Sequence, residues 1–350
     1  MALSTAQQLL AFGRDPVADV ARAAGFASDA EFERAFRRGA AMAPHEYRTL
    51  AQASEFQLQL PDDFRASELL AYVARDPEGL AERVDGATIF KGLATEAAPI
   101  LVSIELQSSR QRARCRLETA RSLRIEDRLS AHAMALRLLG LHSDAEGFQA
   151  RAQADPRVAR LVEARPGLRM PLTATVFEAL VWAILGQQVN LSFATRLRRT
   201  VIELAGRPIP GSALRLHPTP AEVAGLAATA LTERKCSRAK AHYLVQAAQA
   251  VVEGRLPLDG LAEADGGEAE RRLRELHGVG LWTARYVMLR GLGFGDCAPI
   301  GDSGLAAGLQ RFFALPDRPI AAAQERLMAP FAPHRTLATA HLWASFAHAA

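Results

Sequence analysis

The spacing of hydrophobic positions predicts two short helices near the start of the chain. Apolar residues recur at helical spacing in VADVARAAGF, and Gly25 then interrupts the pattern. SDAEFERAFRR begins a second helix, with Ser28 as its predicted N-cap. Two helices joined by a glycine turn have the layout of a helix-turn-helix, although any small helical bundle gives the same pattern.

Between about residues 55 and 165 the pattern changes to a period of two. TIFKGLAT, ILVSIELQSS and RARCRLETA alternate apolar and polar residues, which is typical of half-buried strands. Residues 66–84, ASELLAYVARDPEGLAERV, are predicted to form one helix before them. A small antiparallel sheet with helices is therefore expected here, in a structural role.

From about residue 166 the helical period returns and continues to residue 350. VFEALVWAILG is apolar all round, as in a buried helix, and further helical patterns cover 191–206, 238–254, 268–293 and 336–350. The predicted fold class is therefore mostly α with a small α+β domain. The predicted domains are residues 1–53, 55–165 and 166–350.

Composition excludes several classes of protein. The hydrophobic fraction is 49% and the charged fraction 23%, as in ordinary globular domains, and no apolar run reaches the roughly 20 residues of a membrane span. The start lacks the features of a signal peptide, so a cytoplasmic protein is expected. The cysteines are isolated at positions 115, 236 and 297, which supports neither a zinc site nor a disulfide framework. The formal net charge of +4 is compatible with a polyanionic partner.

The segment LHGVGLWTARYVMLR carries the first chemical signal. Gly278 and Gly280 suit a tight turn between two helices and the close approach of a partner, and Val279 can hold the helices together. Backbone amides at the start of the second helix can bind a phosphate without reading bases. A plain helical hairpin is the structural alternative.

Two aromatics and one carboxylate follow the turn. Trp282 and Tyr286 are four residues apart and share a helix face, where a nucleobase could stack with about 1–3 kcal/mol, or where both could simply pack in a core. Asp302 ends the loop GLGFGDCAPIGD and opens another helix, so it is either an N-cap or a functional carboxylate. A carboxylate repels DNA, but it would stabilise a reaction that builds positive charge.

These segments together resemble a known family. ARPGLRMP, AILGQQVN, GVGLWTARYVMLRG and AHLW resemble the DNA-3-methyladenine glycosylase II group of the helix-hairpin-helix Gly/Pro…Asp DNA glycosylases, from about residue 55 onward. VADVARAAGFASDAEFERAFRRGAAMAPHEYR resembles one of the two helix-turn-helix units of AraC/XylS-type regulators. The resemblance implies a helix-hairpin-helix glycosylase fold preceded by a helix-turn-helix segment. That segment departs from a DNA-binding unit, because Glu31 and Glu33 lie on its second helix, and six acids balance six arginines over residues 1–50.

The resemblance also assigns site residues. Asp302 matches the catalytic aspartate. The base pocket would be lined by Trp282, Tyr286, Trp343, Tyr72 and Gln187, and DNA would be contacted by Gly278, Val279, Gly280, Thr283 and Gln188. Gln188 stands where the family inserts an apolar wedge into the duplex, and PIGD followed by SG is looser than the family pattern.

The implied function is a monofunctional, monomeric DNA glycosylase that excises alkylated purines from double-stranded DNA in base excision repair. Bifunctional relatives place a lysine where this chain has Trp282. No metal or organic cofactor is expected, apart from a monovalent cation held by hairpin carbonyls near Leu276 and Val279. The sequence contains no Pro-Cys-His motif of a methyl-accepting cysteine, so direct methyl transfer by this chain is not expected. The alternative is an AraC-type transcriptional regulator with a non-catalytic C-terminal region.

Overall fold

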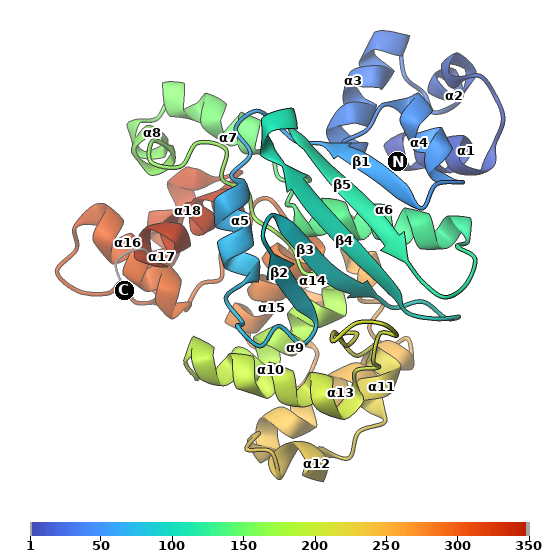
Figure 1. Cartoon of the computed structure of the whole chain (residues 1–350). Helices are drawn as coiled ribbons and strands as arrows, with labels where there is room; N and C mark the ends of the chain where they lie inside the picture. The colour runs from blue at the N-terminus through green and yellow to red at the C-terminus, as the bar shows by residue number, and fades with distance from the viewer. Residues whose placement is uncertain (1, 348–350) are drawn as a thin grey trace. The chain divides into compact units, whose positions relative to one another are not determined.

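The chain folds into two compact units in a computed structural model that describes residues 2–347. The first unit comprises the residues up to 142 together with 208–216, and the second comprises 143–207 with the residues from 217 onward. Helices predominate among these residues, and the strands that they contain all belong to one sheet of the first unit, which confirms the mostly α fold with a small α+β part (Figure 1). The division into three domains stays a prediction, since packing units and domains need not share boundaries.

Four helices open the first unit: α1 (Ala2–Phe12), α2 (Val17–Ala23), α3 (Asp29–Ala40) and α4 (Pro44–Leu50). A short turn joins α2 to α3, and in it Gly25 has a φ of 88°, a conformation that favours glycine. The side chain of Ser28 accepts a hydrogen bond of 3.2 Å from the Glu31 amide, so the predicted N-cap is confirmed.

Two of the three carboxylates on α3, those of Glu31 and Glu33, have partners within the helix and its cap. The Glu31 carboxylate accepts a 3.1 Å hydrogen bond from the Ala27 amide, and Glu33 forms a 2.7 Å ion pair with Arg37. Arg34 and Arg38 are exposed four residues apart, and neither side chain has an ion pair or hydrogen bond within residues 2–347. Glu31 therefore stabilises the start of α3, and the helix exposes charges of both signs.

The sheet is antiparallel, with strand order β1-β5-β4-β3-β2 (Figure 1). Its strands are β1 (Glu55–Gln59), β2 (Glu82–Asp85), β3 (Thr88–Leu93), β4 (Ile100–Gln107) and β5 (Arg112–Glu118). The three predicted strands correspond to β3, β4 and β5. Buried and partly exposed residues alternate along β4, as its alternating sequence pattern predicts.

The prediction of one helix over residues 66–84 was wrong. The helix α5 covers Ala66–Val73 only, and residues 82–85 form β2. Pro77 cannot continue a helix easily, and Gly79 takes a φ of 51° in the turn that follows. The sequence pattern of residues 82–85 alone is compatible with helix or strand. Their antiparallel pairing with β3, in which Val84 lies opposite Ile89, makes them a strand.

An array of aromatic rings joins the N-terminal helices to the sheet unit. Successive ring centroids are 5.1 to 5.8 Å apart, running through Phe26, Phe32, Phe36, Tyr47, His132 and Phe56. His132 lies on α6 (Ile125–Leu138), and its Nε2 is 2.8 Å from the carbonyl oxygen of Ala40 at the end of α3. The N-terminal helices therefore share a hydrophobic core with β1 and α6.

The buried His132 makes the stability of the first unit depend on pH. Burial lowers its pKa from 6.5 to about 4, so its contribution to stability is full above pH 6.5 and is lost as the pH falls toward 4. Substitution His132→Gln keeps a donor for Ala40. Between pH 7 and pH 5, denaturant unfolding should show about 2 kcal/mol less loss of stability in this variant than in the wild type. The exposed His45→Gln is the matched control, and an unchanged pH dependence in His132→Gln would contradict this account.

The second unit is helical. Its helices are α7 (Ala145–Ala150), α8 (Pro156–Val162), α9 (Val176–Gly186), α10 (Leu191–Ala205), α11 (Pro220–Ala224), α12 (Ala228–Thr232), α13 (Arg238–Val252), α14 (Gly266–Arg274), α15 (Leu281–Val287), α16 (Ser303–Phe313), α17 (Ala321–Met328) and α18 (Arg335–Ala347). The last three residues of the helix predicted for 336–350 lie outside the described residues. No helix among the described residues has the length and apolarity needed to cross a bilayer.

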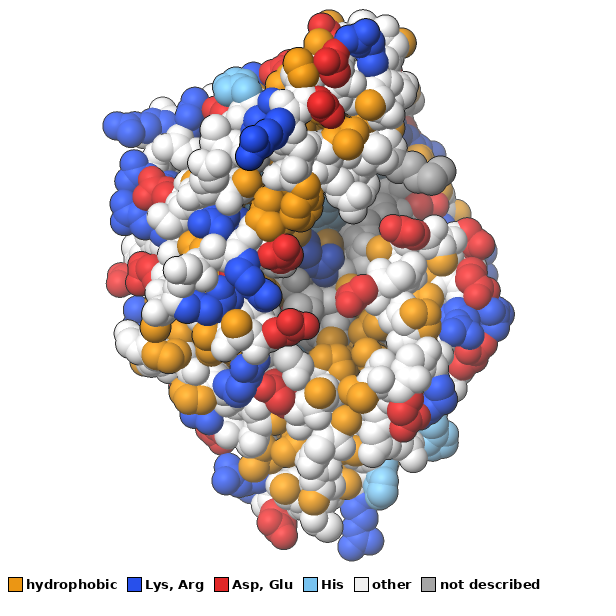
Figure 2. Space-filling view, turned by 90° about the vertical axis from the view of Figure 1, so that its right-hand side faces the viewer, with side chains coloured by type: hydrophobic (Ala, Val, Ile, Leu, Met, Phe, Trp, Pro, Cys, Tyr) orange, Lys and Arg blue, Asp and Glu red, His pale blue; other side chains and the backbone are white. Residues whose placement is uncertain are grey.

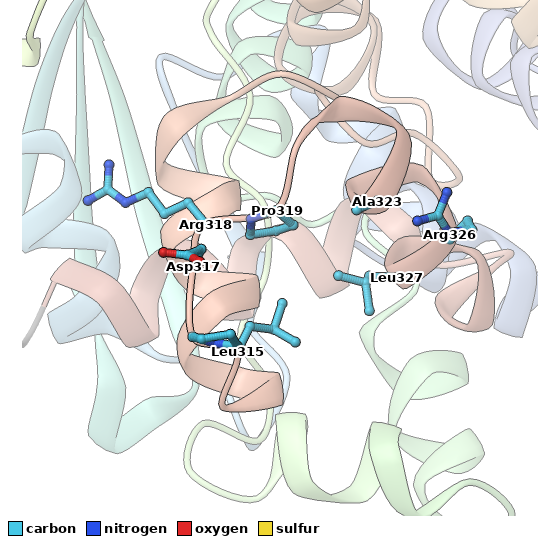
Figure 3. Close-up of a pocket in the computed structure, with 8 residues that line it drawn as sticks. Leu315, Asp317, Arg318, Pro319, Ala323, Arg326 and Leu327 are labelled. Carbon is cyan, nitrogen blue, oxygen red and sulfur yellow. The ribbon is translucent and has the colours of Figure 1, made fainter.

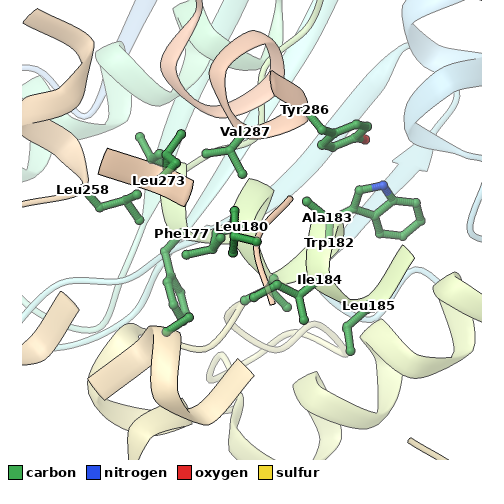
Figure 4. Close-up of a cluster of buried hydrophobic side chains, with 14 of the residues drawn as sticks. Phe177, Leu180, Trp182, Ala183, Ile184, Leu185, Leu258, Leu273, Tyr286 and Val287 are labelled. Carbon is green, nitrogen blue, oxygen red and sulfur yellow. The ribbon is translucent and has the colours of Figure 1, made fainter. Parts of the chain in front are cut away.

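Two cores place the elements of the candidate site. The first surrounds α9, which is buried on every side from Val176 to Leu185, as its sequence predicts; Figure 4 shows this cluster with Tyr286 and Trp182 at its edge. The second core lies between α16 and α18. A Cβ atom at Gly308 would lie 2.8 Å from the Leu342 carbonyl oxygen, so only glycine permits this close crossing. The crossing brings the start of α16 beside Trp343.

Candidate active site

The hairpin between α14 and α15 requires only one of its two glycines for its own fold. Gly278 has a φ of 82°, and a Cβ atom there would lie 2.3 to 2.6 Å from the ring of Tyr243. Gly280 has a φ of −86°, and an added Cβ would meet nothing within 4 Å. Val279 is 6% exposed within the core, which confirms that it holds the two helices together. The space at Gly280 is open toward solvent.

Gln187, at the end of α9, supports the hairpin directly. Its Nε2 donates to the carbonyl oxygen of Gly278 at 2.8 Å and to Oγ1 of Thr283 at 3.0 Å. Thr283 is only 2% exposed and its hydroxyl is bonded to Gln187, so the structure gives this residue almost no surface for the predicted contact with DNA. The sequence indicated that Gln187 lies near the site but gave no sign of these two bonds.

Gln188, the predicted wedge position, is exposed and has a φ of 53°, which turns the chain sharply between α9 and α10. Leu191 follows on the first turn of α10 and is 57% exposed, unusually high for a leucine. The turn therefore presents a polar and an apolar side chain to solvent.

The two hairpin glycines give a matched test of these roles. Gly278→Ala should destabilise the protein by about 1–3 kcal/mol, because the left-handed φ and the Tyr243 ring both oppose a side chain. Gly280→Ala should leave thermal unfolding unchanged, yet weaken binding to duplex DNA if this open space receives a phosphate. Thermal denaturation and fluorescence anisotropy with a labelled duplex measure the two effects. Equal loss of stability in both variants would contradict the division.

Asp302 is the N-cap of α16 and is also held by two tryptophans. Its Oδ1 accepts hydrogen bonds from the Leu305 amide at 2.7 Å and from Nε1 of Trp343 at 2.9 Å. Its Oδ2 accepts one from Nε1 of Trp282 at 3.0 Å. Asp302 is therefore an N-cap and can also be a functional carboxylate, because the capping bond itself holds the carboxylate in place.

The aromatics at Asp302 form one group, here called the aromatic cluster, consisting of Trp282, Tyr286 and Trp343. The ring centroids of Trp282 and Tyr286 are 5.6 Å apart, and those of Tyr286 and Trp343 are 6.3 Å apart. Glycines make room for it, since a Cβ at Gly186 would touch Trp282 at 3.6 Å, and one at Gly304 would lie 3.3 Å from Trp343. The structure thus brings together the predicted carboxylate and three of the four predicted aromatics.

The fourth predicted aromatic, Tyr72, lies on α5 of the first unit. The guanidinium of Arg75 is 4.2 Å from the centre of its ring, a cation–π arrangement. Its role in a base pocket stays a prediction.

A group of ion pairs fixes the helices behind the aromatic cluster. Arg285 on α15 is bonded to Glu270 of α14 at 2.8 Å and to Glu325 of α17 at 2.9 Å. Arg335 of α18 pairs with Asp296, in the loop before Asp302, at 2.7 Å. Sequence reasoning missed these residues, because nothing in their spacing links positions 15 to 40 residues apart.

The cysteine in the loop before Asp302 adds no nucleophile to the site. Burial raises the pKa of Cys297 to about 12, so its thiol stays neutral and is not a nucleophile at ordinary pH. Among the described residues, no group of three or more His, Cys, Asp and Glu side chains could hold a metal ion.

Two open hollows of the second unit lie elsewhere. One, of about 430 Å³, lies between the end of α16 and the start of α17, where Arg318, Pro319 and Arg326 line it (Figure 3). The other, of about 520 Å³, is lined by residues of α8 such as Pro156 and Arg160. Neither includes Asp302 or the aromatic cluster.

Comparison with known families adds the decisive observation. Residues 181–333 match the family described as HhH-GPD superfamily base excision DNA repair protein, and this range contains the hairpin, two members of the aromatic cluster and Asp302. Residues 181–333 thus form an HhH-GPD domain. The matched range begins within α9 and ends before α18, so Trp343 lies outside it.

Two curated proteins resemble the chain over most of its length. A DNA-3-methyladenine glycosylase of Bacillus subtilis is 27% identical over 82% of this chain and 95% of its own length. A "probable bifunctional transcriptional activator/DNA repair enzyme AlkA" of Mycobacterium tuberculosis is 29% identical over 99% of this chain and 70% of its own length. The second alignment thus extends over the N-terminal helices.

Solved structures show the same fold. The 3-methyladenine DNA-glycosylase from Archaeoglobus fulgidus superposes with a TM-score of 0.71, at 19% identity, covering 83% of this chain and 98% of that one. This agreement confirms the predicted helix-hairpin-helix glycosylase fold.

Proposed function

We propose that the chain is a monofunctional DNA glycosylase that flips alkylated purines of the 3-methyladenine type out of double-stranded DNA and hydrolyses their N-glycosidic bond. The observation that carries the proposal is the Asp302 carboxylate, fixed by indole N–H groups of the same aromatic cluster on which a base could stack. The superfamily's role in base excision repair and the names of the relatives support it.

The aromatic cluster suits a cationic base. N-alkylation gives a purine a positive charge, and the electron-rich faces of Trp282, Tyr286 and Trp343 attract such a cation by roughly 0.5–2 kcal/mol each. Selection would then rest on charge and leaving ability, since an alkylated purine leaves readily without a protonating acid.

Asp302 supplies the charge that the reaction needs. As the glycosidic bond breaks, the sugar gains oxocarbenium character, and an ionised carboxylate nearby stabilises it. Oδ1 already accepts two hydrogen bonds, whereas Oδ2 accepts only the one from Trp282 among residues 2–347. We therefore assign Oδ2 as the atom that orients the attacking water and accepts its proton, while the electron pair of the broken bond leaves with the base.

DNA would be held by backbone groups of the hairpin around Gly278, Val279 and Gly280, with Gln188 beside the flipped nucleotide. Figure 2 shows basic and acidic side chains interspersed on the face that it presents, in keeping with a net charge of only +4. Affinity for DNA would therefore come from phosphate contacts at the hairpin more than from a large positively charged surface.

The lysines of the chain argue for simple hydrolysis. The sequence contains only Lys91, Lys235 and Lys240, and none lies on α15. Lys240 is buried, which lowers its pKa, and its Nζ donates at 2.8 Å to the Leu185 carbonyl at the end of α9. A covalent Schiff base with the sugar is therefore not expected.

The hairpin carbonyls fit a monovalent cation. The Leu276 carbonyl accepts one hydrogen bond, from the Val279 amide at 3.1 Å, which leaves a second lone pair. Leu276 and Val279 would hold the ion through oxygen, and the ion would bridge the hairpin to a DNA phosphate.

DNA binding by the N-terminal helices is a second candidate function. It is favoured by the exposed Arg34 and Arg38 on α3, and by the printed name of the relative from Mycobacterium tuberculosis. Replacing both arginines with glutamine and measuring binding to duplexes of varied sequence tests it; equal binding by the variant would reject it.

Asp302→Asn tests the proposed function. Asparagine can still cap α16 through its carbonyl oxygen, but the NH2 group that replaces Oδ2 cannot accept the indole N–H of Trp282, and the neutral side chain cannot stabilise a cationic sugar. Release of methylated bases from alkylated duplex DNA, followed by chromatography, should fall roughly 100- to 1,000-fold while duplex binding persists. Asp317→Asn, on an exposed loop, is the matched control and should release bases at the wild-type rate. Normal release by Asp302→Asn would assign the chemistry to another residue.

The products give an independent test. Reaction with methylated DNA should leave intact strands until alkali is added, because no lysine follows the hairpin. Denaturing electrophoresis before and after alkali measures this. A covalent enzyme–DNA complex trapped by borohydride during turnover would overturn the monofunctional assignment.

A further inference from the structure

The turn that presents Asp302 depends on a glycine that has little conformational preference of its own. Gly301 has a φ of 92°, and the Asp302 amide donates to the Pro299 carbonyl at 2.9 Å. A Cβ at Gly301 would lie 4.0 Å from Cβ of Trp282, so the turn lies close to the aromatic cluster. A glycine in this position can change its dihedral angles at little cost, and the carboxylate that follows would move with it.

One buried side chain removes that freedom. Gln324 on α17 is 3% exposed, and its Oε1 accepts a 2.8 Å hydrogen bond from the Gly301 amide. Its Nε2 donates at 3.0 Å to the carbonyl oxygen of Pro319, in the loop before α17 that Figure 3 shows beside the hollow. Because both ends of the amide are bonded, its orientation is fixed and it holds Gly301 from inside the unit.

We propose that Gln324 is a positioning residue for the glycosylase reaction, which sets the Asp302 carboxylate against the two indole N–H groups by holding the Gly301 amide. This inference rests on the proposed function. It would give Asp302 one support from each of three helices: Trp282 from α15, Trp343 from α18 and Gln324 from α17.

The arrangement makes rotation of the turn the expected consequence of losing Gln324. Ala298 and Ile300 anchor the beginning of the turn in the α16–α18 core, and the Leu305 amide anchors Asp302 at the other end. Gly301 lies between these anchors, and its amide is the group that Gln324 bonds. A shift there would lengthen the bonds from Trp282 and Trp343 to the carboxylate while the cores stay packed.

Gln324→Met tests the proposal, because methionine has a similar length and removes both hydrogen bonds. Gln310→Met is the matched control: Gln310 lies on α16 and donates to the Pro316 carbonyl at 3.1 Å, but it has no bond to Gly301. Single-turnover excision from a methylated duplex at saturating enzyme should fall 10- to 100-fold in Gln324→Met. Its Kd for unmodified duplex should change less than threefold, and Gln310→Met should match the wild type in both.

An NMR experiment tests the proposal without any substrate. The chain has only three tryptophans, Trp182, Trp282 and Trp343, so ¹⁵N-indole NMR gives three N–H signals that single Trp→Phe variants assign. Gln324→Met should shift the signals of Trp282 and Trp343, as Asp302→Asn does, and leave that of Trp182 in place. Gln310→Met should shift none of them.

Gln324→Glu supplies the rescue. A protonated glutamic acid can accept from Gly301 and donate to Pro319 as glutamine does, whereas the ionised form can only accept. The excision rate of this variant relative to wild type should therefore rise as the pH is lowered. A loss of packing alone would give a ratio independent of pH.

The outcomes separate the inference from the function on which it rests. Shifted indole signals together with the rate loss support the positioning role. Unshifted signals, or a Gln324→Met rate within threefold of wild type while Asp302→Asn is inactive, overturn it. Failure of the wild type to release any methylated base overturns the proposed function, and the indole signals then still decide whether Gln324 orients Asp302.

Discussion

The hydrogen bonds from two indole N–H groups to one carboxylate are the interactions on which the candidate site depends. Trp282 reaches Asp302 from α15 and Trp343 reaches it from α18, so both helices must keep their positions for the carboxylate to be held. The hairpin fixes the start of α15, and the close crossing at Gly308 fixes α18 against α16. Features that look purely structural therefore determine the position of the candidate carboxylate.

The same bonds resolve a conflict of charge. A carboxylate beside a DNA backbone is repelled by it, and an unsupported one would turn away toward solvent. Capping α16 and accepting two indole N–H groups hold the carboxylate in place, and no lysine or arginine of residues 2–347 forms an ion pair with it. The negative charge thus stays available for the cationic sugar in the proposed reaction.

The sequence was most informative where one local pattern decides the structure. Trp282 and Tyr286 could be placed on one face from their spacing, and Ser28 and Asp302 could be placed at helix starts from residue type. Gln324 and the Arg285 ion pairs could not be found, because their partners are distant in sequence and polar residues on a helix usually face solvent. The strand β2 was missed for a related reason: its partner strand, not its own four residues, determines its conformation.

The aromatic array of the first unit constrains how this chain can vary in length. The ring of His132 on α6 contacts Phe56 of the sheet, and Tyr47 of the N-terminal segment packs against its edge. A relative without that segment would lose the ring that packs on His132, and a polar surface would be needed there. The N-terminal helices and the sheet thus exclude water from the same rings. A gene fusion or truncation at this boundary would therefore give a stable protein only together with substitutions on the sheet side.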